Sequence, residues 1–316
     1  HLGALFSFTL CIGLHHCICT QGLMATPPRP PFATMPSAPK TPDQPCRQAV
    51  PAQHCAMVAR TDVGRRRDNN EDAVTIHPGA QPWPIAVLAD GMGGYNAGEV
   101  ASAMAISLVS VALQSVATEA STANTVQARQ ELQQSLANAL NLANAAILTA
   151  AQKTPGCRGM GTTIIAAALL PGLLMLAHLG DSRAYGWRDG RLLRLTRDHT
   201  WLQEEIDAGR IQDHEARQSG LGHLLTQALG VTQDVTPDFN EWPLQPGDRI
   251  LLCSDGLTDM LDDQAIAALF TQSSPLPVLL TSLLAAANEA GGNDNISAAL
   301  IEILASPPSP AVTSID

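Results

Sequence analysis

The feature that most constrains the fold is a pair of strand–turn–strand patterns in the middle of the chain. Four short, mostly apolar runs cover residues 161–170, 173–179, 182–187 and 192–196. Pro171-Gly172 separates the first two runs, and Asp189-Gly190 lies between the last two. Such dipeptides favour tight turns, and two strands joined by a tight turn pair antiparallel. The chain is therefore expected to build antiparallel sheet.

Helical patterns alternate in blocks with the other strand patterns. Further strands are expected at residues 55–61, 85–89, 237–242, 248–253 and 296–303. Helices are expected at residues 98–120, 125–152, 262–271 and 276–290, and the polar stretch 198–217 leans towards helix. A glycine-rich loop is expected at 90–94. Hairpins with segregated helix pairs are typical of an α+β layer architecture with mainly antiparallel sheets.

The two ends of the chain do not have the composition of a folded domain. Residues 2–14 are apolar like the core of a signal peptide but lack a basic flank, and residues 27–51 contain nine prolines. We expect 1–54 to be a non-globular leader and Pro-rich linker, and we expect the natural start of the protein at Met24, Met35 or Met57. Residues 55–305 are expected to form one domain, and 306–316 a disordered tail.

Charge and cysteine content exclude several classes of protein. Lys plus Arg is 18 against 29 Asp plus Glu, a net charge of −11, whereas a nucleic-acid binder needs a basic footprint. No uncharged apolar run in the body reaches the roughly 18 residues of a membrane span. The seven cysteines have no repeating spacing, which suits reduced thiols in a cytoplasmic protein.

Four segments each place a carboxylate beside Gly or Asn at the end of an expected strand. They are Asn70-Glu71-Asp72, Asp90-Gly91, Ser254-Asp255-Gly256 and Asn293-Asp294-Asn295. Each one alone is typical of a turn. If the four converge, their negative charges need a counter-cation, and oxygen donors without paired histidines suit Mg²⁺ or Mn²⁺ better than Zn²⁺.

These residues resemble the motifs of the metal-dependent Ser/Thr protein phosphatases of type 2C, the PPM family, in its bacterial branch. The resemblance covers about residues 57–303 and follows the family's order and spacing. The first motifs are Thr61-Asp62-x-Gly64-x-x-Arg67-x-x-Asn70-Glu71-Asp72, Leu88-Ala89-Asp90-Gly91-Met92-Gly93-Gly94 and Gly161-Thr162-Thr163. The later motifs are Leu179-Gly180-Asp181-Ser182-Arg183-Ala184-Tyr185, Thr196-Arg197-Asp198-His199, Leu252-Cys253-Ser254-Asp255-Gly256-Leu257-Thr258-Asp259 and Gly292-Asn293-Asp294-Asn295-Ile296-Ser297.

The resemblance implies a four-layer α-β-β-α sandwich with two Mn²⁺ or Mg²⁺ ions at one end of the paired sheets. The implied metal-binding residues are Asp90, which bridges both ions, the Gly91 carbonyl, Asp255, Asp294, and Glu71 and Asp72 directly or through water. Arg67 would bind the substrate phosphate and act in catalysis with Asp90. The supporting residues would be Asn70, Thr162, Asp198 and Asn295.

The implied reaction is chemically consistent with these residues. Two ions about 3.5–4 Å apart can hold a shared hydroxide at neutral pH for in-line attack on phosphorus. A guanidinium such as Arg67 offers fork geometry to phosphate oxygens. Met92 replaces the histidine that eukaryotic relatives carry as the proposed general acid. Residues 155–160 contain no carboxylate, so a third metal is not expected unless Asp198 or Asp259 supports it.

Several nearby residues have simpler structural interpretations. Thr162 and Thr163 are expected to bond near the site, Asp181 and Arg183 to stabilise a sheet end, and His199 to be a polar structural residue. Asn293 and Asn295 are expected to orient Asp294 through their side chains. The segment 200–223 is expected to form a solvated flap.

Three functions remain from different classes. The leading one is hydrolysis of phosphoserine and phosphothreonine on proteins, opposing a bacterial Ser/Thr kinase, by a monomer that binds neither nucleic acid nor membrane. The second is a phosphoprotein-binding module of the same fold with weak catalysis. The third is a nucleotide-binding ATPase using the 91–94 loop, although that loop lacks a following Lys-Ser/Thr.

Overall fold

The computed structural model describes residues 54–79, 83–94, 97–119, 125–212 and 224–305. The expected leader up to residue 53, part of the expected flap and the tail from 306 lie outside these ranges. The described strands are β1 (Cys55–Asp62), β2 (Asp72–His77), β3 (Ile85–Met92), β4 (Gly161–Thr162), β5 (Ile164–Leu170), β6 (Leu173–Leu179), β7 (Arg183–Arg188), β8 (Arg191–Arg194), β9 (Asp238–Pro243), β10 (Arg249–Cys253) and β11 (Ile296–Ile303). The described helices are α1 (Ala97–Glu119), α2 (Val126–Lys153), the short 3-10 helix η1 (Pro155–Cys157), α3 (Trp201–Asp207), α5 (Asp255–Thr258), α6 (Asp263–Phe270) and α7 (Leu276–Glu289).

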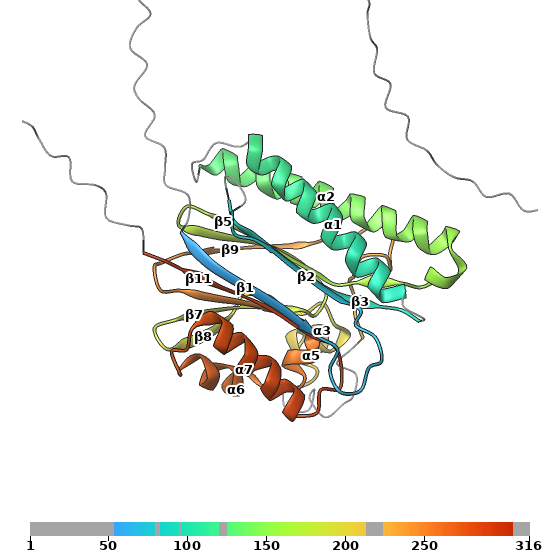
Figure 1. Ribbon diagram of the computed structural model, residues 1–316. Helices are drawn as coiled ribbons and strands as arrows, with labels where there is room; N and C mark the ends of the chain where they lie inside the picture. Colours follow the sequence, from blue (N-terminus) through green and yellow to red (C-terminus); the bar gives the residue numbers. More distant parts are fainter. Residues whose placement is uncertain (1–53, 80–82, 95–96, 120–124, 213–223, 306–316) are drawn as a thin grey trace, which may run out of the picture. The chain divides into compact units, whose positions relative to one another are not determined.

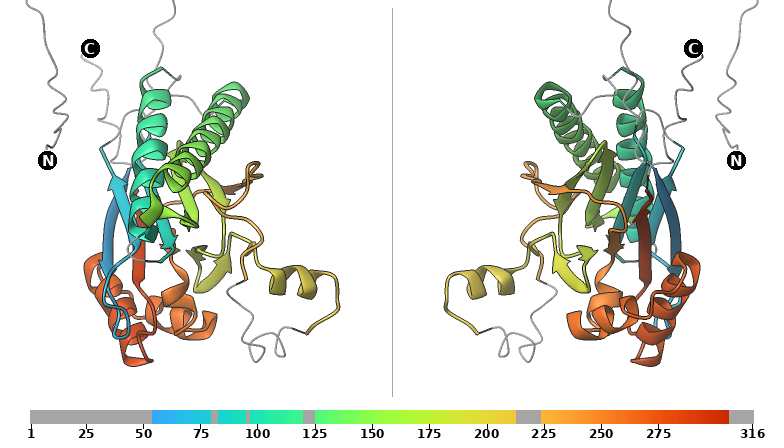
Figure 2. Two further views of the ribbon diagram at one scale, coloured as in Figure 1. Left: turned by 90° about the vertical axis from the view of Figure 1, so that its right-hand side faces the viewer. Right: turned by 90° about the vertical axis from the view of Figure 1, so that its left-hand side faces the viewer.

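Two antiparallel sheets stack face to face, with helices on both outer faces. One sheet has the order β1-β11-β10-β7-β8, and the other has the order β2-β3-β5-β6-β9 with β4 paired to β3. Helices α1 and α2 cover the second sheet, and α6 and α7 cover the first (Figure 1; Figure 2). The expected α+β class and four-layer α-β-β-α sandwich are confirmed.

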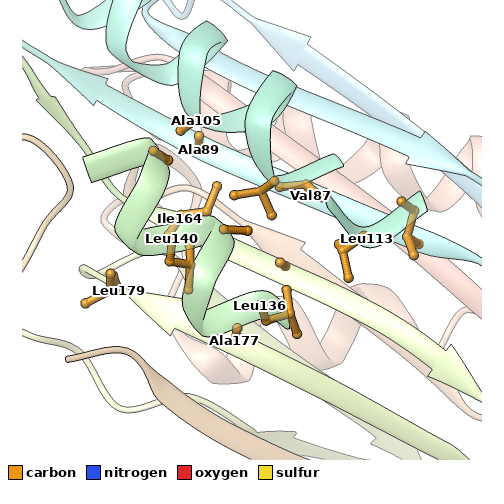
Figure 3. Packing of buried hydrophobic residues seen from close by; sticks show 14 of the residues in the cluster. Val87, Ala89, Ala105, Leu113, Leu136, Leu140, Ile164, Ala177 and Leu179 are labelled. Carbon is orange, nitrogen blue, oxygen red and sulfur yellow. The ribbon is translucent and has the colours of Figure 1, made fainter. Parts of the chain in front are cut away.

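The alternation of side chains along the central strands builds the core between these layers. Ile85, Val87 and Ala89 of β3 pack towards α1 and α2, whereas Ala86 and Leu88 face the other sheet. Figure 3 shows the outer cluster, in which Ile164 lies beside Leu140 of α2, and Val87 and Leu136 belong to the same cluster. Because β3 is buried on both faces, it reads as a continuous apolar run in the sequence.

Both hairpins are confirmed at the expected turns. Strands β5 and β6 pair antiparallel around Pro171-Gly172, and β7 and β8 pair around Asp189-Gly190. Asp189 and Gly190 have φ of 51° and 76°, the left-handed conformation that a type I′ hairpin turn requires at both positions.

The structure differs from the expected elements mainly near the site. Strand β3 does not end at Ala89 in a glycine-rich loop. It continues to Met92, because Asp90 pairs with Asp72 of β2, and Gly91 and Met92 pair with β4. The run 161–170 is interrupted at Thr163, which separates β4 from β5. Strand β2 and helix α5 were not expected.

One described helix, α1, is long and apolar enough by length and composition to cross a membrane, over Ala97–Ser115. In the structure it lies on the second sheet. Its Ala101, Ala105, Val109 and Leu113 are buried there in the outer core.

Candidate active site

The four predicted carboxylate segments meet at one end of the paired sheets. Asp72 begins β2 and lies directly opposite Asp90 of β3. Asp255 begins α5 two positions after the end of β10, and Asp294 lies two positions before the start of β11. The Asp255 and Asp294 segments touch each other, since a Cβ on Gly256 would come 2.0 Å from the Asn295 carbonyl oxygen.

A serine joins the two sheets at this end. The Ser254 hydroxyl donates to Asp72 Oδ2 at 2.8 Å and accepts the Ser297 backbone N–H at 2.9 Å. Asp72 Oδ1 is buried and has no hydrogen-bond partner among the described residues. A buried carboxylate oxygen without a donor is costly, so this atom is suited to a cationic ligand or its water.

Burial and neighbouring charges raise the pKa of two of these carboxyls, Asp72 and Asp90. Burial raises the pKa of the Asp72 carboxyl to about 7, and the charges of Asp255 and Asp294 act in the same direction. Burial and the charge of Asp72 raise the pKa of Asp90 well above its usual range, with a further contribution from Asp255. This is the electrostatic signature of negative charges sharing a site without a counter-cation.

Asp181 also belongs to this acidic group, although its sequence position suggested only a sheet-stabilising role. Burial raises the pKa of its carboxyl well above the usual range, and so do the charges of Asp255 and Asp198. The residue follows β6 by two positions and is 9% exposed. Its carboxylate-after-strand position is the same signal that singled out the other four segments.

Arg67 lies on the rim and contacts the site. Its Nη2 donates to Asp294 Oδ2 at 2.7 Å, and the two side chains are 53% and 34% exposed. The charge of Glu71 also acts on the Arg67 guanidinium. The arginine is therefore placed at the solvent edge of the carboxylates, as expected for a group that binds an incoming anion.

The Asn295 side chain binds the loop after β1. It was expected to orient Asp294 instead. Its Oδ1 accepts the Glu71 N–H at 2.8 Å, and its Nδ2 donates to the carbonyls of Val63 and Asn69 at 3.0 and 2.9 Å. Asp294 Oδ1 instead accepts the backbone N–H of Asn295. The side chain therefore orients the Arg67 loop, not Asp294, because its amide faces three backbone groups of that loop.

Asn70 and Gly91 hold the start of β2 in place. The Asn70 amide donates to Thr61 Oγ1 at 2.6 Å, and its Oδ1 accepts the Asp72 N–H. The Gly91 N–H donates to the Glu71 carbonyl at 3.2 Å. A Cβ on Gly91 would come 2.2 Å from the Gly98 carbonyl oxygen, so only glycine fits here.

Thr162 and Thr163 hold the Asp90 backbone. Thr162 Oγ1 donates to the Asp90 carbonyl at 2.9 Å, and Thr163 Oγ1 accepts the Asp90 N–H at 3.0 Å. Both side chains are buried. These two hydrogen bonds fix the position of the Asp90 backbone at the end of the sheet.

Asp198 is held by two guanidiniums. Arg183 binds it through Nε and Nη2, the latter at 2.7 Å, and Arg194 forms a second ion pair. The Asp198 side chain is 8% exposed. The two arginines balance the charge of the Asp198 carboxylate, so its ion pairs are structural. The same carboxylate acts electrostatically on Asp181.

His199 is likewise committed to structure. Its Nδ1 accepts the Gly180 N–H at 3.2 Å, its Nε2 lies 3.2 Å from Asp238 Oδ2, and its ring lies 4.8 Å from that of buried His178. Because Nδ1 accepts, the proton of the neutral ring is on Nε2, directed at Asp238.

The donor set at this end suits hard divalent cations. It consists of carboxylate and carbonyl oxygens, with the unpartnered Asp72 Oδ1 and mutually destabilised carboxyls among them. In the described ranges no group of three or more His, Cys, Asp or Glu side chains is already drawn together as a ligand cluster. Asp294 is turned towards Arg67 instead. The residues still fit Mg²⁺ or Mn²⁺, because their donors are oxygen atoms and their carboxyls carry negative charge.

Comparison with known proteins places the chain among bacterial phosphatases. Residues 63–302 match the family model described as protein phosphatase 2C. The chain is 37% identical over 243 residues to protein phosphatase PhpP of Streptococcus pneumoniae, covering 77% of this chain and 95% of that protein.

Solved structures agree with that similarity. A serine/threonine phosphatase of S. agalactiae superposes with a TM-score of 0.71 at 32% identity, covering 79% of this chain and 100% of that one. The catalytic domain of the phosphatase PstP, solved in complex with two manganese ions, gives 0.66 at 35% identity, covering 79% and 99%.

Proposed function

Because this chain belongs to the protein phosphatase 2C family and is a metal-dependent Ser/Thr protein phosphatase, we propose that it removes phosphate from phosphoserine and phosphothreonine on proteins with two Mn²⁺ or Mg²⁺ ions. One observation carries the assignment to particular residues. Asp72 lies opposite Asp90 at one end of the sheets, the charge of Asp255 acts on both carboxyls, and Arg67 lies at the rim.

The ions would be held by Asp90, the Gly91 carbonyl, Asp255 and Asp294, with Glu71 and Asp72 binding directly or through water. Two such ions, when bound, supply a hydroxide nucleophile at neutral pH and neutralise charge on the phosphoryl oxygens. The chain's part is to fix these donors: Thr162 and Thr163 hold the Asp90 backbone, and Ser254 holds Asp72.

Arg67 would bind the phosphate of the substrate. Its guanidinium already binds an oxyanion, the Asp294 carboxylate at 2.7 Å, and phosphate offers the same fork geometry. Exchange of one oxyanion for the other needs only a side-chain movement, because both groups are partly exposed. This positions phosphorus beside the carboxylate end for in-line attack.

The proton for the leaving alkoxide would come from water. Met92 carries no transferable proton, and His199 is 2% exposed with Nε2 directed at Asp238. Neither side chain can donate to the leaving oxygen. This part of the proposal distinguishes the chain from relatives that place a histidine after the Asp-Gly pair.

The proposal includes the cellular role expected from the sequence. The chain would oppose a bacterial Ser/Thr kinase, using that kinase and its targets as phosphoprotein substrates. Action in the cytoplasm and as a monomer stay predictions. The alternative of a catalytically weak phosphoprotein-binding module is disfavoured because the carboxylates are retained together, and nothing favours an ATPase.

Phosphate release from a phosphothreonine peptide tests the proposal. Activity is expected with Mn²⁺, and none with EDTA. Asp255→Asn should lower kcat by more than about 100-fold, since even outer partners of metal ligands are worth 10–100-fold. Asp234→Asn, which neutralises an exposed carboxyl outside the proposed metal-binding set, is the matched control. Turnover that survives EDTA or Asp255→Asn would overturn the metal mechanism.

A further inference from the structure

An exposed basic loop borders the candidate active site and is only partly used by the proposed chemistry. Residues 63–69, here called the arginine loop, contain Arg65, Arg66 and Arg67 against one acidic residue, Asp68. The protein as a whole carries −11. Three adjacent arginines in so acidic a chain, beside a site that takes a phosphate, suggest a role in binding anions.

Arg65 and Arg66 differ from most other arginines in having no carboxylate partner within the described residues. Both are exposed. Eight other arginines there form ion pairs: Arg67, Arg129, Arg183, Arg188, Arg194, Arg197, Arg210 and Arg249. The guanidiniums of Arg65 and Arg66 are therefore available to an anion from outside the chain.

The arginine loop has a fixed backbone. The Asn295 amide donates to Val63 and Asn69 at its two ends, and the Arg65 N–H donates to the Gly292 carbonyl at 2.7 Å. Gly64 has φ of 77°, and a Cβ there would lie 2.1 Å from the Asp294 carbonyl oxygen. A ligand that binds this loop does not have to order it first, which lowers the entropic cost of binding.

The loop also lies within reach of a substrate held at Arg67. It packs directly on the turn 292–295 that presents Asp294, and the Arg65 stem lies against Gly292. An extended peptide advances about 3.3 Å per residue. Side chains of arginine length at 65 and 66 can therefore meet groups within about three residues of the phosphorylated one.

We propose that Arg65 and Arg66 form a second anion-binding subsite, which selects substrates bearing a carboxylate or a second phosphate close to the phosphoserine or phosphothreonine. The inference rests on the proposed phosphatase function and deepens it. Arg67 binds the phosphate to be removed, and its two neighbours bind the flanking anion. These arginines are specificity residues and take no part in the chemical step.

Paired phosphothreonine peptides that differ at one position test this subsite in the full chain. The flanking position two residues from the phosphothreonine is Asn, Asp or phosphoserine, and Kd is measured by fluorescence anisotropy alongside kcat and KM with Mn²⁺. Wild type should favour the Asp and phosphoserine peptides about three- to tenfold in Kd and KM at low salt, since exposed ion pairs are weak individually. The preference should shrink as salt rises.

The variant Arg65→Ala/Arg66→Ala should lose this preference and keep wild-type hydrolysis of p-nitrophenyl phosphate. Arg191→Ala, an exposed arginine with no described ion pair at the far end of the first sheet, should keep the preference. A wild type that binds all three peptides equally, or a double variant that still discriminates, would overturn the subsite. If wild type does not hydrolyse p-nitrophenyl phosphate with Mn²⁺, the proposed function is contradicted. The Kd values of the three peptides would still decide whether the subsite exists.

Discussion

Asp72 and Asp90 are cross-strand partners in the antiparallel pair of β2 and β3, so their carboxyls project from the same face of the sheet. Like charges directly opposite each other destabilise a sheet, and burial increases the effect. The site therefore costs the fold stability, and a bound cation would offset that cost.

Neutralising one partner should stabilise the protein without metal. At a pH above 7 in EDTA, where the carboxyls are driven towards their charged forms, Asp90→Asn is expected to gain about 1 kcal/mol from relieved repulsion, which is about 2–4 °C in Tm for a domain of this size. Differential scanning calorimetry measures the shift. Asp234→Asn should move Tm little. A lower Tm for Asp90→Asn would show that the two carboxylates do not repel each other in the folded protein.

The pH dependence of stability should carry the signature of Asp72. Its folded-state pKa of about 7 is above the unfolded value near 3.8, so the folded state holds the proton more tightly. The associated stability is fully present below about pH 4 and is lost as pH rises towards 7. In EDTA, wild type should therefore lose stability relative to Asp72→Asn as the pH rises over that range. A difference independent of pH would contradict the raised pKa.

Removing the Asn295 amide should damage both fold and activity. Asn295→Ala leaves the Glu71 N–H and two carbonyls without their partner, at about 1–3 kcal/mol for a buried group that stays unsatisfied. We expect a loss of about 2–4 kcal/mol in unfolding free energy and a raised KM, since Arg67 is carried on the loosened loop. Asn288→Ala is the comparison, because it removes one hydrogen bond from a side-chain amide, the bond that Asn288 Nδ2 donates to Asp62. Equal effects would argue against a special role for Asn295.

Asp198 should behave as a structural ion-pair residue. Asp198→Ala leaves Arg183 and Arg194 without their shared carboxylate, and breaking a buried pair costs about 3–5 kcal/mol. Chemical denaturation should show that loss, while Mn²⁺ affinity measured at a temperature where the variant is folded should stay near wild type. A variant of normal stability and weakened Mn²⁺ binding would make Asp198 a metal ligand instead.

Local patterns predicted the layers well because each is encoded in neighbouring residues. Pro171-Gly172 and Asp189-Gly190 specify their hairpins, and the double-sided burial of β3 produces its apolar run. Strand β2 was missed because Asp72–His77 shows no clean alternation and depends on pairing with β3. The same pairing carries β3 past Ala89, where the sequence alone suggested a loop.

The site was predictable as a set of residue types but not as a network. Asp90, Asp255 and Asp294 stand out because each lies beside glycine or asparagine at a strand end. The role of Asn295 depends on partners more than 220 positions away, which no local pattern reveals. Asp181 was undervalued because its proximity to Asp255 arises only when β7 pairs with β10, two strands far apart in the sequence.

Direct measurement of metal binding tests the central claim most simply. Isothermal titration calorimetry of the metal-free protein with Mn²⁺ should give two ions per chain for wild type. Asp90→Asn should lose measurable binding, because we propose that Asp90 would be a ligand of both ions. Asp90→Asn that binds Mn²⁺ with wild-type stoichiometry and affinity would contradict the assignment of this end of the sheets as the metal centre.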